Sequence, residues 1–424
     1  MYCREPRIFA LLAALGALAA CGSDGKTPSH GGPSDDGGSD SMSATAGTTT
    51  DTGGTATNTG GSANSNQGGA AAQAGTPTTT GGQAPTGGAN MGGTAAGGSA
   101  STEYWIATDG ADTNPGTEDK PFKTIPVAIL KTKAGVTLWL KPGTYQYAVT
   151  IDIGPRYVGT AAAPITLKAA PGPRPVLDFS SQPRGVDAAR GINVNGDYWH
   201  IKGIELLKAS DNCIAIAGSN NIIEDVIVHE CGDTGIQITA PSSQATDQTR
   251  AANNTILNCD SWGNLDEATG GENADGFAAK LRIGPGNVFK GCRAWNNADD
   301  GWDLFAADDV VKIDGCWAFS NGKPIGGTNP QGDGNGFKLG GAPNGAGQGG
   351  AVHLVTDSFG FENKACGFVR NNNPELPKLT ACGAKDNKTA YCNLTVAGEV
   401  DMTMAAADAI TAKRAADGSL PAMK

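Results

Sequence analysis

The sequence predicts an all-β fold, a right-handed parallel β-helix, in which every turn of the chain adds one strand to each sheet of a solenoid. Short apolar strands recur between about residues 150 and 394, as in Gly191–Val194 and His200–Ile204. The repeat takes about 24 residues from Cys292 to Cys316, where no loop interrupts it. A β-sandwich or propeller would require hairpin turns, and the sequence has no clear signal for them.

Asparagines occupy matching places near the ends of many of these strands. The set comprises Asn264, Asn297, Asn321, Asn363 and Asn387. Stacked asparagine side chains can hydrogen-bond to one another along a solenoid, and asparagine tolerates the left-handed backbone of a tight turn. The sequence therefore predicts an asparagine ladder.

Three longer loops separate the repeats on one face. They cover residues 263–272, 323–332 and 340–350. Insertions on one face of a solenoid usually build its binding cleft, so we expect the functional site to lie between these loops.

Residues 1–21 have the pattern of an export signal. Arg4 and Arg7 precede an apolar run from Ile8 to Ala20 that is too short to span a membrane. Leu18-Ala19-Ala20-Cys21 resembles a bacterial lipobox, which predicts a lipid on Cys21 and, because Gly22 follows, placement at the outer membrane or cell surface. The alternatives are ordinary cleavage near Ala20 and release to the extracellular space.

The remaining chain divides into a linker and one folded domain. Residues 22–101 are rich in Gly, Ser, Thr, Ala and Asn and predict a disordered linker. Residues 102–424 predict the β-helix domain, with a helix and strand cap over about 102–150. A helical tail is expected over about 400–424, with its helix at 402–417 covering the last rung.

Composition restricts the partners of this chain. The net charge of −11 and the sequence pI near 4.9 argue against nucleic acid. A polyanionic substrate would need a bound cation between itself and the protein. Any membrane contact would be made only through the lipid on Cys21, and we expect a monomer.

Eight cysteines fall in the folded domain and permit disulfides in an exported protein. Their pairing cannot be chosen from the sequence. Cys259, Cys292 and Cys316 share one repeat position, so they are also consistent with a stack of small apolar side chains.

Three segments read as copies of one another and organise the predicted site. They are 273–278 (Asn-Ala-Asp-Gly-Phe-Ala), 299–304 (Asp-Asp-Gly-Trp-Asp-Leu) and 334–339 (Gly-Asn-Gly-Phe-Lys-Leu). If their glycines, Gly276, Gly301 and Gly336, share a column, then Phe277, Trp302 and Phe337 point inward and Ala278, Asp303 and Lys338 point outward. Asp275, Asp299, Asp300 and Asp303 then converge with Lys338 on one surface, as a calcium site beside a base would require.

Several motifs resemble the pectate lyases of polysaccharide lyase family 9. They are Asn258–Ser261, Gly271–Phe277, Cys292–Asn297, Asp299–Asp303, Gly336–Gly341 and His353–Val355. The resemblance covers roughly Trp105 to Asn393. It implies a β-helix that cleaves polygalacturonate, the backbone of pectin, by calcium-dependent β-elimination. The matching positions imply that Asp275, Asp299, Asp300 and Asp303 hold Ca²⁺ and that Lys338 is the base. The chain departs from the family pattern in the Gly-rich loop after Gly340 and in Pro374–Leu379.

This chemistry needs a neutral base near the metal. The proton at C5 of the uronate lies beside a carboxylate, and a cation on that carboxylate acidifies the C–H bond. We expect calcium and burial to lower the pKa of Lys338 from its ordinary value near 10.4. Lys280 is the rival base, and Asp260 and Asp308–Asp309 are minor candidates for metal ligands. The cations available for substrate carboxylates are Arg282, Lys290, Arg293, Lys312 and Arg370.

Other functions remain open at this point. A hydrolase of the polygalacturonase type should supply a histidine near its acids, and none of His30, His200, His229 and His353 falls between residues 275 and 304. A lyase for another polyuronide, such as alginate, and a non-enzymatic carbohydrate-binding β-helix are the alternatives. The sequence does not decide between endo and exo action, or the preferred methylation and oligomer length.

Overall fold

The computed structural model describes residues 102–423 apart from 187, 242–244, 247–248, 327–328 and 342–349. The predicted signal, Cys21 and the linker 22–101 lie outside the described residues. Part of the predicted loop 340–350 and a short piece of the loop 323–332 lie outside them as well. Within the described residues, no helix is long and apolar enough to cross a membrane.

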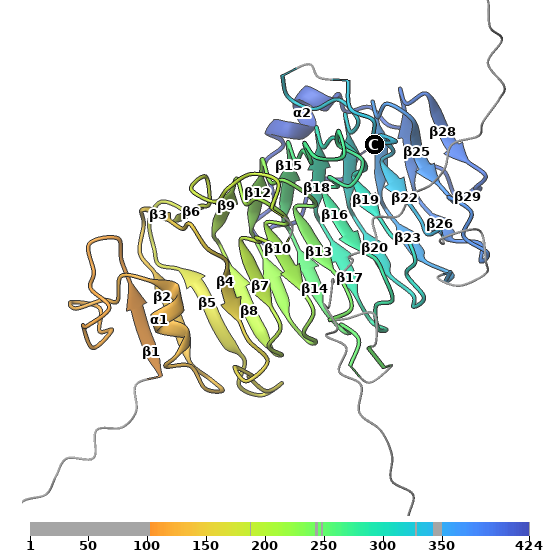
Figure 1. Ribbon diagram of the computed structural model, residues 1–424. Helices are drawn as coiled ribbons and strands as arrows, with labels where there is room; N and C mark the ends of the chain where they lie inside the picture. The colour runs from red at the N-terminus through yellow and green to blue at the C-terminus, as the bar shows by residue number, and fades with distance from the viewer. Residues whose placement is uncertain are drawn as a thin grey trace, which may run out of the picture. The chain divides into compact units, whose positions relative to one another are not determined.

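The described chain forms three parallel sheets, which we call sheets A, B and C (Figure 1). Every pairing between named strands is parallel, so successive rungs stack one strand on the next in each sheet, as predicted. A β-sandwich or propeller built on hairpins does not fit these parallel pairings.

Sheet A has 11 strands. They are β1 (Glu103–Ile106), β2 (Thr137–Leu140), β5 (Ile165–Ala169), β8 (Trp199–Lys202), β11 (Ile222–Glu224), β14 (Thr255–Leu257), β17 (Val288–Lys290), β20 (Lys312–Asp314), β23 (Leu354–Thr356), β26 (Lys378–Thr380) and β29 (Val396–Ala397). Part of the predicted insertion at 374–379 is therefore the start of a regular strand.

Sheets B and C have 9 strands each. Sheet B contains β3 (Thr144–Gln146), β6 (Val176–Asp178), β9 (Glu205–Leu207), β12 (Ile227–His229), β15 (Asp260–Trp262), β18 (Arg293–Trp295), β21 (Trp317–Phe319), β24 (Phe359–Phe361) and β27 (Gly383–Lys385). Sheet C contains β4 (Ile151–Ile153), β7 (Ile192–Val194), β10 (Ile214–Ile216), β13 (Ile236–Ile238), β16 (Phe277–Ala279), β19 (Trp302–Asp303), β22 (Phe337–Lys338), β25 (Cys366–Val369) and β28 (Thr389–Cys392).

The interior of the solenoid is filled by columns of side chains from successive rungs. In sheet C, Phe277, Trp302 and Phe337 are fully buried, and their ring centroids lie 4.8 Å apart at each step. This register confirms that the glycines before them share one column. Burying aromatic side chains of this size is the main source of stability here, at about 25 cal/mol per Å² of apolar surface.

The asparagine ladder is confirmed by hydrogen bonds. Asn264 Nδ2 donates to Asn297 Oδ1 at 2.9 Å, and Asn297 Nδ2 donates to Asn321 Oδ1 at 3.0 Å. The ladder continues through Asn363 to Asn387. The expected left-handed backbone lies instead at the residue before each ladder asparagine, such as Asn296, because the ladder residue itself must point inward.

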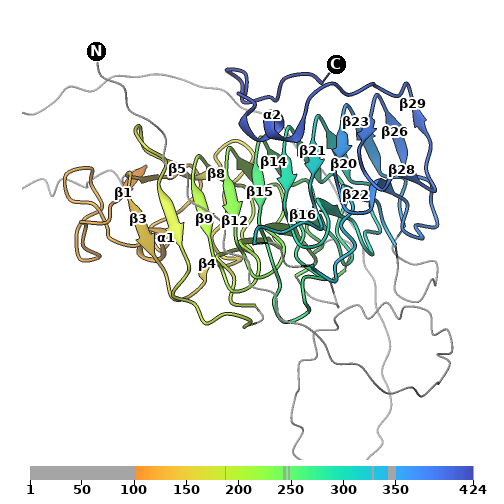
Figure 2. The same cartoon turned by 90° about the horizontal axis from the view of Figure 1, so that it is seen from above.

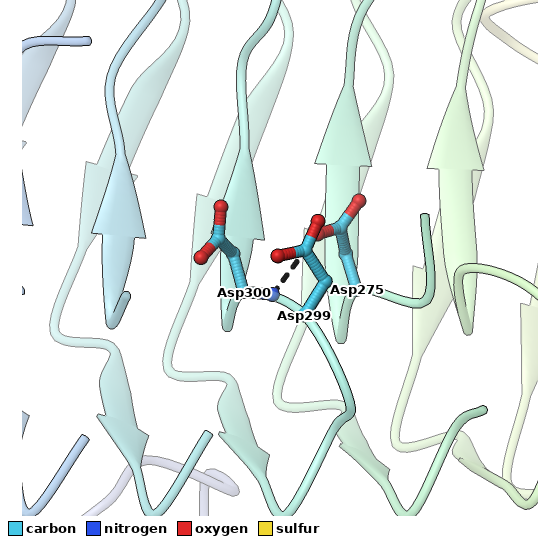
Figure 3. A group of neighbouring side chains, drawn as sticks. All are labelled: Asp275, Asp299 and Asp300. Atoms are coloured by element: carbon cyan, nitrogen blue, oxygen red, sulfur yellow. Dashed lines mark hydrogen bonds between the residues drawn. The ribbon is translucent and has the colours of Figure 1, made fainter. Parts of the chain in front are cut away.

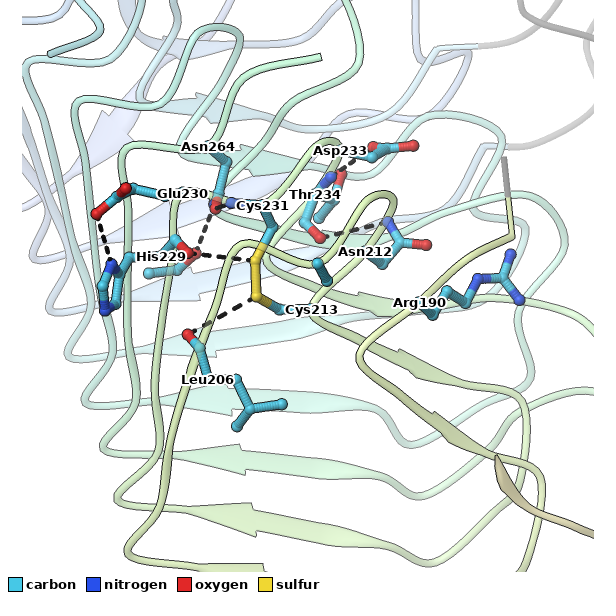
Figure 4. The surroundings of a disulfide bond; sticks show 12 residues. Arg190, Leu206, Asn212, Cys213, His229, Glu230, Cys231, Asp233, Thr234 and Asn264 are labelled. Carbon is cyan, nitrogen blue, oxygen red and sulfur yellow. Dashed lines mark hydrogen bonds and ion pairs between the residues drawn. A yellow bond between two sulfur atoms is a disulfide. The ribbon is translucent and has the colours of Figure 1, made fainter. Parts of the chain in front are cut away.

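The cysteines divide into two groups. Cys213 pairs with Cys231 (Figure 4) and Cys366 pairs with Cys392, which settles the pairing that the sequence left open. The other described cysteines, Cys259, Cys292, Cys316 and Cys382, are free and buried. The first three stack along one column, where each backbone N–H of Cys259 and Cys292 lies 3.4 Å from the next sulfur. The stacked-apolar interpretation of these three is therefore confirmed.

The N-terminal cap contains the short helix α1 (Ile125–Ile129) beside β1 and β4. Its residues Ile125, Ala128 and Ile129 are buried, so the helix closes the open end of the core.

The C-terminal tail differs from the prediction in length and place. Its helix α2 covers only Ala406–Thr411, not 402–417, and no side chain caps its N-terminus. The start of the tail contacts the last rung at β27, where Val400 N–H donates to the carbonyl oxygen of Cys382 and Lys385 Nζ donates to that of Met402, whereas the helix itself lies over earlier rungs of sheet B. Met402, Ala406 and Ala409 pack on the outer face of sheet B, against a row of aromatic side chains that includes Trp317. Figure 2 shows α2 lying beside β14, β15 and β21. The aromatic row offers a large apolar surface, whereas the end of the solenoid offers little.

Candidate active site

The three similar segments stack on adjacent rungs of sheet C, as the sequence predicted. Ala278 of β16 pairs with Asp303 of β19, which pairs with Lys338 of β22. The turns that precede β16 and β19 place Asp275 and Asp300 at matching positions on adjacent rungs. The repeat of Gly followed by an aromatic residue therefore places each polar side chain on the outer face.

Three buried carboxylates form the centre of the site. Asp275, Asp299 and Asp300 each offer an oxygen atom, and these atoms lie within 4.8 Å of one another (Figure 3). We call these three residues the acid group. Asp303 is also buried, but its Oδ2 faces Lys280 at 3.3 Å, so it lies at the edge of the acid group.

Backbone N–H groups orient the carboxylates. Asp333 N–H donates to Asp299 Oδ1 and Asn335 N–H donates to Asp300 Oδ1, both at 2.6 Å. The second oxygen of Asp300, Oδ2, is buried and has no hydrogen-bond partner. Lys338 Nζ is its positive neighbour at 3.6 Å, beyond hydrogen-bond distance, so this buried oxygen has an ion-pair partner but no donor, which is unfavourable and favours a further positive group there.

The pKa values of the acid group reflect this crowding. Burial, more than the neighbouring charges, raises the pKa of Asp275 to about 6. Burial and the adjacent carboxylate also hold the pKa values of Asp299 and Asp300 well above the usual range. A cation would favour the charged forms.

The residues present fit a calcium ion. Ca²⁺ prefers hard oxygen ligands, mostly carboxylates, and accepts irregular geometry. The acid group supplies three such carboxylates, and Asp300 Oδ2 has an ion-pair partner in Lys338 but no hydrogen-bond donor. Asp303 faces Lys280 through Oδ2 and accepts a hydrogen bond from Phe305 N–H at Oδ1, 2.9 Å away, so it would join them only by changing these contacts.

Lys338 lies next to the acid group. Its Nζ is 3.6 Å from Asp300 Oδ2 and 3.5 Å from Asp333 Oδ2. Burial lowers the pKa of Lys338, but the carboxylates of Asp303 and Asp300 outweigh burial and hold the pKa well above its ordinary value. The pKa of Lys338 is therefore raised here, whereas the sequence analysis expected it to be lowered. The difference arises because the neighbouring carboxylates are not neutralised by a cation.

Lys280, the rival base, is enclosed by carboxylates. Its Nζ lies 3.0 Å from Asp275 Oδ2 and 3.3 Å from Asp303 Oδ2, and the residue is buried. Burial opposes the charge on Lys280, but Asp275 and Asp303 outweigh burial and raise its pKa. Because its Nζ is enclosed by these two carboxylates, Lys280 is not placed to accept a proton from a substrate.

Two acidic residues beside the site escaped the sequence analysis. Asp333 directly follows the loop 323–332, and Lys364 Nζ holds that loop by donating to the carbonyl oxygens of Pro330 and Gly332, both at 2.9 Å. Asp233 lies one rung before Asp275, and burial raises its pKa to about 7. The signal for Asp233 was present, since Asp-Thr-Gly-Ile at 233–236 is a weaker copy of the repeated segment.

The basic residues proposed for substrate are mostly engaged elsewhere. Arg293 is wrong as a substrate ligand, because it is buried on sheet B, pairs with Asp260 at 2.6 Å and donates to Ala409 O at 2.8 Å. Lys290 pairs with Asp314 at 3.1 Å on sheet A, and Lys312 lies on the same sheet. Neither lysine belongs to the strands that carry the acid group.

Two candidate cations follow strands of sheet C. Arg282 follows β16 and remains half exposed, with its Nε 3.7 Å from Asp308 Oδ2. Arg370 follows β25 and donates to the carbonyl oxygens of Asn373 and Pro374. Of the five candidates, Arg282 is the one that shares a rung with Asp275.

The minor acidic candidates are also bound to other groups. Asp260 pairs with Arg293 and with Arg414, the latter at 2.5 Å. Asp308 pairs with Arg250 at 2.9 Å. Neither aspartate lies in the acid group, so these two minor candidates are not metal ligands here.

The described histidines lie away from the acid group. His200 contacts Glu224, and His229 contacts Glu205. His353 accepts a hydrogen bond from Val311 N–H on sheet A and is fully buried. No described histidine is therefore placed to assist a pair of acids in hydrolysis.

The fold and the site define a class: a right-handed parallel β-helix with a buried acidic site and a lysine on neighbouring rungs of one sheet. Residues 104–402 match the family described as "Pel9A-like, right handed beta helix region". The chain belongs to this family.

Individual relatives agree with this assignment. The chain is 41% identical to Pectate lyase L of Paenibacillus polymyxa over 294 residues, which cover 68% of this chain and 64% of that protein. It is 34% identical to Pectate lyase PEL9 of Emericella nidulans, covering 68% of this chain and 74% of that protein. The chain thus spans just under two thirds of the length of Pectate lyase L.

A solved structure supports the same fold. The crystal structure of pectate lyase Pel9A superimposes with a TM-score of 0.65 at 32% sequence identity. The match covers 75% of this chain and 87% of Pel9A. The resemblance to the pectate lyases of polysaccharide lyase family 9 is therefore confirmed.

Proposed function

We propose that this protein is a calcium-dependent pectate lyase that cleaves α-1,4-linked polygalacturonate by β-elimination. The observation that carries the proposal is the placement of Lys338 Nζ 3.6 Å from Asp300 Oδ2, a buried oxygen with no hydrogen-bond partner. A base directly beside a group of carboxylates that can hold a cation is the arrangement that this reaction needs. The family relatives named pectate lyase support the same substrate class.

In this proposal, Asp275, Asp299 and Asp300 hold the ion, and Asp303 joins them from the edge of the acid group. Bound calcium would neutralise the carboxylates and polarise the uronate carboxylate, which acidifies the neighbouring C5 proton. Lys338 takes that proton onto Nζ. The C4–O4 bond breaks, a C4=C5 double bond forms, the departing O4 oxygen gains a proton from water, and Lys338 Nζ then returns the C5 proton to solvent.

Lys338 can act only in its neutral form. Without a cation, the carboxylates around it hold its pKa above the ordinary value, so it stays protonated and inactive. Neutralising Asp299, Asp300 and Asp303 would remove the interactions that raise this pKa, and burial would then lower it. The site is therefore expected to be inactive without metal and to have an alkaline optimum with it.

The test is the identity of the product from polygalacturonate, measured with calcium and with chelator. A lyase produces an unsaturated uronide that absorbs ultraviolet light, and we expect this absorbance only in the presence of calcium. New reducing ends without the absorbance would mean hydrolysis. If polygalacturonate yields neither the absorbance nor new reducing ends, but alginate yields the absorbance, the protein is a lyase for another polyuronide. If it binds these polymers without cleaving them, it is a carbohydrate-binding protein.

We further propose that the protein is exported and anchored through a lipid on Cys21, on the basis of Leu18–Cys21 and the preceding apolar run. The linker 22–101 would then hold the β-helix away from the membrane surface. Mass spectrometry of the N-terminal peptide from membranes tests this. A peptide that begins at Cys21 and carries acyl chains is expected, whereas an unmodified peptide in the culture fluid would contradict anchoring.

A further inference from the structure

Lys280 is a buried cation inside the proposed metal site that the reaction does not use. It follows directly after β16, and its side chain reaches back over the outer face of sheet C. Its Nζ lies 3.0 Å from Asp275 Oδ2 and 3.3 Å from Asp303 Oδ2, and only 9% of the residue is exposed. Both contacts are therefore shielded from water.

The two lysines of the site differ in how they are held. Lys338 lies 3.5–3.6 Å from its two carboxylates, and one of these, Asp333, has a side chain that is 61% exposed. Lys280 is closer to its two partners, and both of them are buried. The two lysine side chains are similarly buried, 14% and 11% exposed, but Lys338 has longer ion pairs, whereas Lys280 is held between two buried proposed metal ligands.

Because Asp275 belongs to the acid group, Lys280 and a metal ion compete for the same carboxylate. Thr234 Oγ1 also donates to Asp275 Oδ2, at 3.1 Å, so this oxygen is held firmly without metal. A fixed positive charge close to a cation site opposes binding of the cation, and this opposition is strong where water is excluded.

We propose that Lys280 is a built-in counter-ion that keeps the carboxylates together in the metal-free protein and weakens their affinity for calcium. The inference rests on the proposed calcium site and adds a function to it. Lys280 keeps the metal-free protein folded and makes calcium exchangeable, so that activity follows the calcium concentration outside the cell. Coupling between two ligands of this kind is reciprocal, so calcium binding loosens Lys280 by the same factor.

The test is calcium binding measured by isothermal titration calorimetry on the full chain after metal removal. We expect Lys280→Met, which keeps the length of the side chain but not its charge, to bind calcium about tenfold more tightly than the wild type. Lys280→Arg keeps the charge and should stay within about threefold of the wild-type affinity. Calcium should raise the melting temperature of Lys280→Met more than that of the wild type.

The inference would be overturned if Lys280→Met bound calcium no more tightly than the wild type. It would also be overturned if the substitution lowered the melting temperature by the same amount with and without calcium. If Lys280→Met does not fold without metal, Lys280→Gln, which retains a hydrogen-bond donor, is measured in the same way. Failure of both variants to fold with calcium would mean a purely structural role and would also overturn it. The proposed function fails separately, if the wild type itself binds no calcium.

Discussion

Two buried charge clusters on the outer faces of this β-helix show how charge balance separates structure from function. On sheet B, one carboxylate, Asp260, is bound by two guanidinium groups, from Arg293 and from Arg414 of the C-terminal tail. On sheet C, Asp275, Asp299, Asp300 and Asp303 share two lysines. The sheet B cluster has one more positive than negative charge, and both oxygens of its carboxylate are paired, whereas the sheet C cluster has an excess of negative charge.

The excess is located at one atom. Every side-chain oxygen of Asp260 has a guanidinium partner, whereas Asp300 Oδ2 is buried without a hydrogen bond. A buried ion pair that is fully matched serves mainly to fix one arrangement of the chain. An unmatched buried carboxylate is costly, so it is best explained by a ligand that supplies the missing charge.

Replacing the base should have the largest effect on activity. Lys338→Ala removes the group that accepts the C5 proton, so we expect kcat to fall by about 10³-fold, within the range for a general base. Calcium affinity should not weaken, because a positive charge beside the acid group is lost. Initial rates of unsaturated product formation measure the effect, with Lys378→Ala on sheet A as the control. A fall of less than about tenfold would move the base elsewhere.

Breaking the sheet B cluster should have the largest effect on stability. Asp260→Asn leaves Arg293 buried without its carboxylate and releases the tail, and we expect a loss of about 3 kcal/mol in the free energy of unfolding. The loss should be the same with and without calcium, and the reaction rate should not change. Denaturant unfolding followed by fluorescence measures it. A loss that calcium reverses would show that the two clusters are not separate.

The pH dependence of stability tests the charge state of the buried carboxylates on sheet C. Burial raises the folded-state pKa of Asp275 to about 6 and of Asp233 to about 7, above the ordinary value of 3.8. The folded state therefore holds these protons more tightly than the unfolded state does, so raising the pH favours unfolding. We expect the melting temperature of the metal-free protein to fall between about pH 4 and pH 7, and calcium to reduce this fall. A melting temperature that rises across this interval without metal would contradict the account.

The smallest effect on activity is expected for a change at Asp333, at the edge of the site. Asp333 is 3.5 Å from Lys338 Nζ, but its side chain is 61% exposed, and exposed ion pairs contribute little. Asp333→Asn keeps the backbone N–H that binds Asp299, so we expect kcat/KM to change by less than about threefold. Steady-state kinetics on polygalacturonate measure this. A loss as large as that of Lys338→Ala would show that Asp333 takes part in the reaction.

The sequence predicted features that repeat along the chain. The column of Gly276, Gly301 and Gly336 follows from the two-residue periodicity of a strand, so the outward positions of Asp303 and Lys338 could be derived in advance. The asparagine ladder and the stacked cysteines follow from the same repeat. Only the exact turn residue with left-handed backbone was misplaced by one position.

Features that depend on contacts between distant segments could not be predicted. The tail packs on sheet B because Arg293 binds the carbonyl oxygen of Ala409, a residue 116 positions away, and no repeat signals this contact. The partners of Lys280 depend on the direction of a long flexible side chain, which sequence spacing does not fix. For the same reason, Arg293 was assigned to the substrate although it stabilises the tail.

The central claim is that the unmatched carboxylate at Asp300 marks a calcium site. Its most direct test is calcium binding by isothermal titration calorimetry to the metal-free wild type and to Asp300→Asn, which keeps the size of the side chain and removes its charge. We predict one calcium ion per wild-type chain and a loss of affinity of at least about 100-fold in Asp300→Asn. No binding to the wild type, or equal binding to both proteins, would contradict the account.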